Sequence, residues 1–81
     1  MKKEELIRAL EEDKKGNWDA AHEIVQQSNS QLACWIHAYL HRKEGDIGNS
    51  GYWYTRAGKN FPAMLLEEEW AVLYDLIKQL P

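Results

Sequence analysis

The sequence predicts an all-α fold of about five helices, and three features of its 81 residues lead to this prediction. No segment alternates between apolar and polar residues, so strands are not indicated. Apolar residues instead recur at steps of three and four, and the clearest such stripe stands near the C-terminus. The third feature is an internal repeat, whose two copies align Gly16 with Gly45.

A first helical hairpin is expected over residues 1–28. Its first helix covers residues 2–14 and is stopped by Gly16. Asn17 is a suitable N-cap for the second helix. The side chains that form the packing sides of these two helices are Leu6, Ile7, Leu10, Trp18, Ala21, Val25 and Ser28.

A second hairpin is expected over residues 30–58. Asn29 or Ser30 caps its long helix, and Gly45 ends that helix. The predicted apolar positions of this hairpin are Leu32, Trp35, Ile36, Tyr39, Leu40, Trp53, Tyr54 and Ala57.

A short fourth helix is expected to open at Asn49 or Ser50 and to end at Gly58. The glycine-rich segment before it, residues 45–51, matches no phosphate-binding pattern and is interpreted as a connection between helices.

The last helix is expected over residues 62–80, because proline is favoured in a first helical turn. Its apolar stripe is Leu66, Trp70, Leu73, Ile77 and Leu80. This helix is expected to cover the open face of the second hairpin.

The repeat aligns residues that are 29 positions apart, which is the separation of Gly16 and Gly45. It places "KKGNWDAAHEIVQQS" on "KEGDIGNSGYWYTRA", so that small residues meet small ones and turn residues meet turn residues. The spacing resembles that of the tetratricopeptide repeat, although the period of that family, about 34 residues, is longer. The resemblance implies two tetratricopeptide-like hairpins.

The segments "WIHAYLHRKEGD" and "YWYTRAG" also resemble a group of small bacterial helical proteins of unknown function. This resemblance covers about the middle third of the chain. It implies a compact helical domain and brings no assigned chemistry.

Composition limits the classes of partner. The single Cys34 excludes an internal disulfide, and together with the lack of a signal peptide or apolar span it favours a cytoplasmic protein without a membrane partner. The net charge of −3 argues against duplex nucleic acid. The acidic runs at residues 11–13 and 67–69 are interpreted as solvated faces.

Histidines four apart can share a metal ion, and His37 and His41 have this spacing, with His22 as a third ligand if the second and third helices pack face to face. Because the ligand set is incomplete, neither a metal nor any other cofactor is predicted. Cys34 is interpreted as a packed thiol, and no spacing identifies catalytic residues or an enzyme.

The residues left over from core packing are the candidate site for a ligand or partner: His37, His41, Arg42, Tyr52 and Arg56. Arginine binds carboxylates well, so an acidic peptide or a C-terminal carboxylate is the expected partner of a small protein-interaction module. Two alternatives stay open. One is a small-ligand or metal site in the same cluster, and the other is a purely structural homodimer formed through the last helix.

Overall fold

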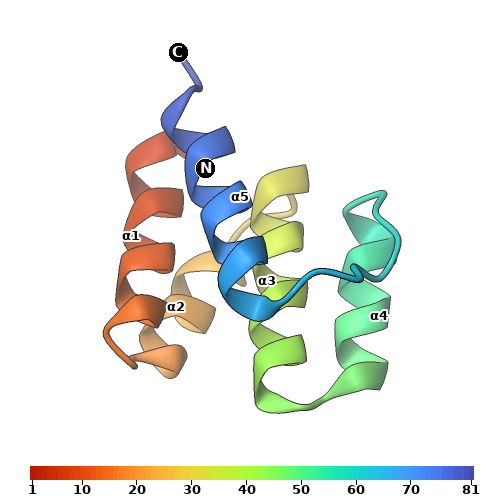
Figure 1. The fold of residues 1–81 in the computed structure, drawn as a ribbon. Coiled ribbons are helices and arrows are strands. Elements are labelled where there is room, and N and C mark those ends of the chain that lie inside the picture. Colours follow the sequence, from red (N-terminus) through yellow and green to blue (C-terminus); the bar gives the residue numbers. More distant parts are fainter.

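The computed structural model describes residues 1–81 and contains five α-helices and no strand (Figure 1), which confirms the predicted fold class. None of the helices combines the length and the apolar character that crossing a membrane requires. In chain order the helices are α1 (Lys3–Lys14), α2 (Trp18–Val25), α3 (Gln31–Glu44), α4 (Ile47–Arg56) and α5 (Leu66–Lys78).

The α1–α2 and α3–α4 turns have the same backbone geometry. Each turn places a glycine at positive φ, 92° at Gly16 and 89° at Gly45, a conformation that side chains with a Cβ disfavour. Each also closes the end of its first helix with two equivalent hydrogen bonds. Their N–H donors and C=O acceptors are Gly16 to Asp13 and Asn17 to Glu12, then Gly45 to Arg42 and Asp46 to His41.

Helix α3 lies at the centre of the molecule, with the other helices packed around it (Figure 1). Every residue from 33 to 41 is buried, so this helix has no solvent-facing side over most of its length. Ser30 caps it by accepting a hydrogen bond from the Ala33 N–H. The helix therefore presents different side chains to α2 and α4 on one side and to α1 and α5 on the other.

Helix α4 begins earlier than expected. Asp46 is its N-cap and accepts from the Asn49 N–H, so α4 includes Gly48 and Gly51. The glycine-rich segment is therefore mostly helix, and only Gly45 and Asp46 form the connection. A carboxylate cap made the earlier start possible despite two glycines in the first turns.

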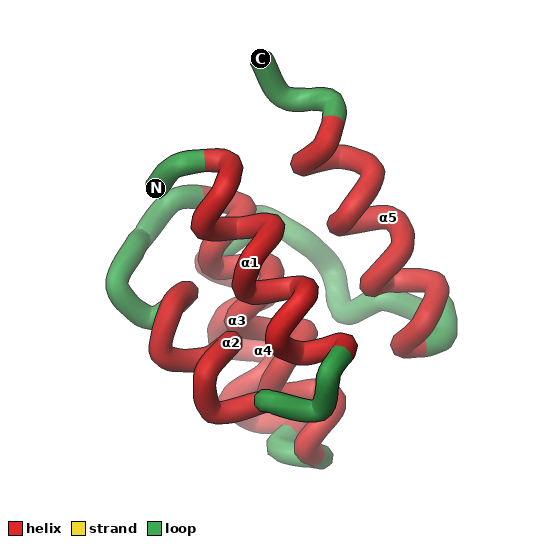
Figure 2. The backbone as a smooth tube through the Cα atoms, turned by 90° about the vertical axis from the view of Figure 1, so that its left-hand side faces the viewer, coloured by secondary structure: helices red, strands yellow, loops and turns green.

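Helix α5 begins later than expected, at Leu66 rather than near Pro62. The Glu68 carboxylate accepts from the Leu65 N–H and completes the start of the helix. Helix α5 packs against α3, which belongs to the second hairpin, and also against α1 of the first hairpin, on the side away from α2 (Figure 2). Its row of buried residues, Glu69, Leu73 and Ile77, explains this position.

Candidate functional site

The five predicted site residues lie in three different places. His37 and His41 are buried on the side of α3 that faces α2. Arg42 lies on the side that faces α5. Tyr52 and Arg56 lie on the exposed face of α4, where the Arg56 guanidinium donates to the Tyr52 hydroxyl over 3.1 Å. The role of all five residues in partner binding stays a prediction.

Arg42 is occupied by an internal ion pair. Its guanidinium donates to the Glu69 carboxylate over 2.7 Å and also to the carbonyl oxygen of Met64. The same carboxylate accepts from the Trp35 indole over 3.0 Å and from the Tyr54 hydroxyl. Burial and this contact with Glu69 raise the pKa of Tyr54 well above its usual value. Arg42 therefore joins α3 to α5 and has little freedom to bind a ligand.

The interpretation of the two acidic runs as solvated faces is wrong for one residue in each. Glu69 is fully buried and Asp13 is 2% exposed, and both have cationic or hydroxyl partners inside the fold. The positions of Asp13 and Glu69 along their helices could have predicted this burial. Asp13 continues the row of Leu6 and Leu10, and Glu69 stands four residues before Leu73 on the buried row of α5.

Three histidines meet between α2 and α3. The Nε2 atoms of His22 and His37 are 3.0 Å apart, and one ring nitrogen from each of His22, His37 and His41 lies within 4.8 Å of the others. The His41 Nδ1 atom is 2.7 Å from the Glu44 carboxylate. We refer to His22, His37 and His41 as the histidine cluster. Helices α2 and α3 do pack on one another, which was the condition for His22 to join the other two.

Two tryptophans flank the histidine cluster. Trp18 stacks on the His22 ring with centroids 4.9 Å apart, and Trp53 stacks on His37 at 3.9 Å. The Arg56 guanidinium lies 5.1 Å from the centre of the Trp53 ring, so Arg56 is near the cluster without reaching it. Cys34 is buried and free, as expected of a packed thiol.

Two rings of the histidine cluster, His22 and His37, favour the neutral form. Burial, and then the neighbouring His22 and His41, lower the pKa of His37 to about 4. Burial and His41 also lower the pKa of His22. A neutral imidazole has one nitrogen with a free lone pair. The Nδ1 atom of His37 is buried and has no hydrogen-bond partner.

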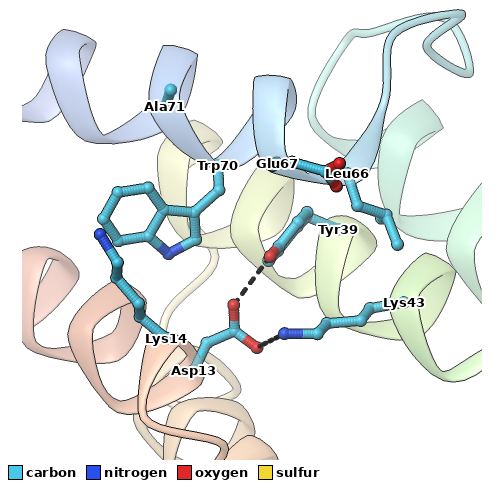
Figure 3. Close-up of a pocket in the computed structure, with 8 residues that line it drawn as sticks. All are labelled: Asp13, Lys14, Tyr39, Lys43, Leu66, Glu67, Trp70 and Ala71. Atoms are coloured by element: carbon cyan, nitrogen blue, oxygen red, sulfur yellow. Dashed lines mark hydrogen bonds and ion pairs between the residues drawn. The ribbon is translucent and has the colours of Figure 1, made fainter.

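A separate cavity opens on the opposite side of α3, between the end of α1 and the start of α5 (Figure 3). Its volume is about 460 Å³. Helix α5 contributes the apolar wall with Leu66 and Trp70, and lysines from α1 and α3 stand at its sides. Its full lining is Asp13, Lys14, Tyr39, Lys43, Leu66, Glu67, Trp70 and Ala71, none of which is among the five predicted site residues.

A buried carboxylate, that of Asp13, lies at the base of this cavity. Asp13 accepts from the Tyr39 hydroxyl over 2.7 Å and from the Lys43 ammonium over 2.9 Å (Figure 3). Burial and the contact with Asp13 raise the pKa of Tyr39 well above its usual value, so Tyr39 remains a hydrogen-bond donor. The Lys14 ammonium lies 4.6 Å from the centre of the Trp70 ring, whose indole N–H donates to the Leu10 carbonyl.

No family model, curated protein or solved structure matches this chain.

Proposed function

We propose that this protein is a small interaction module of two tetratricopeptide-like hairpins, which binds an acidic peptide segment of a partner protein in the cavity beside Trp70. The repeat is supported by the identical hydrogen bonds of its two turns. It is also supported by burial, because residues related by the 29-residue offset are buried in pairs. These pairs include Ala9 with Ala38, Leu10 with Tyr39, Ala21 with Ser50 and Val25 with Tyr54.

The observation that carries the proposal is the placement of Lys14 and Lys43. They occupy equivalent positions in the first helix of each hairpin, since they too are 29 residues apart, and both line the cavity. Each ammonium has three donors, and Lys43 gives only one contact to Asp13. Both lysines therefore keep donors for a carboxylate of the partner.

The wall of the cavity would supply most of the affinity. Lys14 and Lys43 are balanced by Asp13 and Glu67, so the site carries no net positive charge. Apolar contact with Leu66 and Trp70 then favours binding, while the two lysines orient the acidic groups. A peptide that alternates acidic and apolar residues has the matching chemistry.

The test is a titration followed by proton–nitrogen NMR. The probe is a hexapeptide of alternating Glu and Leu, compared with an amidated copy and with a Lys–Leu copy. We expect shifts at the amides of Lys14 and Lys43 and at the Trp70 indole with the acidic peptides alone. Lys14→Ala should weaken binding about two- to fivefold, the effect of one partly exposed ion pair.

Lys15→Ala is the matched control, because Lys15 is adjacent, exposed and outside the cavity lining. It should leave binding unchanged. The proposal fails if the acidic and basic peptides give the same shifts, or if Lys14→Ala binds as well as the parent chain.

Self-association through α5 is a second candidate, favoured by one exposed apolar row. Val72, Leu76 and Leu80 are 39%, 44% and 37% exposed and stand four residues apart. Leu76 and Leu80 also border a cavity of about 280 Å³ beside Leu32 and Trp35. Sedimentation of the parent chain and of Leu76→Glu tests this candidate, and a monomer at every concentration of the parent chain would exclude it.

A further inference from the structure

The histidine cluster lies apart from the proposed peptide cavity. The cluster lies between α2 and α3, whereas the cavity lies between α1, α3 and α5, and the two share no residue. An ordinary packing role explains one buried histidine well. It explains less well why three imidazoles contact one another with only one carboxylate, Glu44, bonded to any of them.

We propose that His22, His37 and His41 bind one divalent transition-metal ion, for which Zn²⁺ is the best fit. Each side chain offers a ring nitrogen, and the three nitrogens already lie within 4.8 Å of one another. In a tetrahedral site with Zn–N bonds of 2.0–2.1 Å, ligand nitrogens are about 3.4 Å apart. The Nε2 atoms of His22 and His37 are 3.0 Å apart, so small side-chain rotations would open the site for the ion.

The backbone supports this geometry. His37 and His41 are one helical turn apart on the buried helix α3, so their separation is fixed by the helix. The rings of Trp18 and Trp53 restrict the rotation of His22 and His37. Ligands held in this way lose little conformational entropy when the ion binds.

The donor set selects the class of metal. Three neutral imidazoles suit zinc, copper, nickel and cobalt, whereas calcium and magnesium require oxygen ligands. Three protein ligands leave a fourth position for water or another small ligand, and His22 is only partly buried, so that position can reach solvent.

The histidine ligands differ in the hydrogen-bond partners of their second ring nitrogens. Glu44 bonds to the His41 Nδ1 atom and would orient Nε2 toward the ion, as carboxylates do behind many zinc-bound histidines. The Nδ1 atom of His37 has no such acceptor. We therefore expect an affinity about 10- to 100-fold weaker than that of a site in which every histidine has an outer partner.

A second group of possible ligands does not form a separate site. His41, Glu44 and Asp46 also lie close together. However, Asp46 is used as the N-cap of α4, and Glu44 already bonds to His41. Both carboxylates are exposed and need no ion.

The test uses untagged, chelator-treated protein titrated with zinc chloride by calorimetry, and with cobalt chloride by visible absorption. We expect one ion per chain and the visible bands of tetrahedral Co²⁺. His22→Gln should weaken zinc binding at least about 100-fold, and Glu44→Gln about 10- to 100-fold. Glu23→Gln is the matched control on α2, because Glu23 lies beside His22 and outside the ligand group, and it should bind as the parent chain does.

A direct observation of the imidazoles keeps the test decisive if His22→Gln fails to fold. Long-range proton–nitrogen spectra of the parent chain should show ring-nitrogen shifts at all three histidines at one equivalent of zinc. Absence of binding at millimolar zinc would overturn the proposal. So would unchanged affinity in folded His22→Gln, or shifts confined to His41.

Discussion

At the scale of residues, breaking the Arg42–Glu69 ion pair is expected to have the largest effect on the free energy of unfolding. Glu69 is fully buried and Arg42 is its only cationic partner, at 2.7 Å. Removing one member of a buried ion pair leaves an uncompensated charge, which typically costs 3–5 kcal/mol. This cost is large for a chain of 81 residues, since domains are commonly stable by about 5–15 kcal/mol.

We therefore predict that Arg42→Ala lowers the free energy of unfolding by about 3–5 kcal/mol, measured by urea denaturation. Glu67→Gln, two residues before Glu69 and exposed, is the control and should change it by less than about 0.5 kcal/mol. Equal effects of the two substitutions would show that the buried pair does not stabilise the fold.

His37 predicts the direction of the pH dependence of the metal-free protein. Its pKa is lowered to about 4 in the folded state, against 6.5 for an unperturbed ring, so the unfolded chain binds the proton more tightly. The contribution of neutral His37 to the free energy of unfolding is fully present above pH 6.5 and is lost as the pH falls toward 4.

With a chelator present, we expect the free energy of unfolding to fall by about 2 kcal/mol between pH 7.5 and pH 5. Urea midpoints at the two pH values measure it. His37→Gln should remove most of this dependence, and the same slope in both proteins would contradict the assignment to His37.

At the scale of elements, the two hairpin turns differ in one side chain. Asp46 caps α4 by accepting from the Asn49 N–H, whereas the Asn17 side chain donates to Glu12 and makes no cap bond to α2. A matched pair of alanine substitutions isolates the cap.

We predict that Asp46→Ala lowers the free energy of unfolding by about 1 kcal/mol and that Asn17→Ala lowers it by less. Thermal unfolding of both variants gives the comparison. A larger loss for Asn17→Ala would mean that its contact with Glu12 matters more than the cap at Asp46.

The glycines of the second hairpin have opposite expected responses to alanine. Gly51 lies inside α4 with open space where a Cβ would stand, so Gly51→Ala should stabilise the protein by about 0.5–1 kcal/mol. Gly45 has φ of 89°, and Gly45→Ala should destabilise it by about 1–2 kcal/mol. Thermal unfolding of the two variants separates a helical glycine from a turn glycine, and the same sign for both would contradict this view.

The same elements show how far sequence reasoning reaches. Periodicity predicted the five helices and most of the core, because a buried stripe is a local property of each helix. The predicted starts of α4 and α5 were wrong. In each case a carboxylate, that of Asp46 or of Glu68, accepts a hydrogen bond at the start of the helix, and proline and glycine preferences did not indicate that position.

The arrangement of the whole molecule was harder to predict. Periodicity does not say which helices meet, so the packing of α5 on α1 was not predicted alongside its packing on α3 of the second hairpin. For the same reason, the cavity beside Trp70 was missed. Arg42 was grouped with His37 and His41, although its side chain lies on the side of α3 that faces α5. The meeting of His22 with His37 and His41 was anticipated only as a condition, which the packing of α2 on α3 meets.

The burial of Glu69 has a consequence for the order of folding. Its carboxylate can leave water without a large penalty only if the donors of Trp35, Arg42 and Tyr54 are already in place. Those donors belong to α3 and α4, whose contacts are local in sequence and should form early. Helix α5 is therefore expected to dock late, after the transition state.

Arg42→Ala should then increase the unfolding rate much more than it slows refolding, as stopped-flow mixing into and out of urea would record. A mainly slower refolding rate would instead show that α5 docks before the barrier.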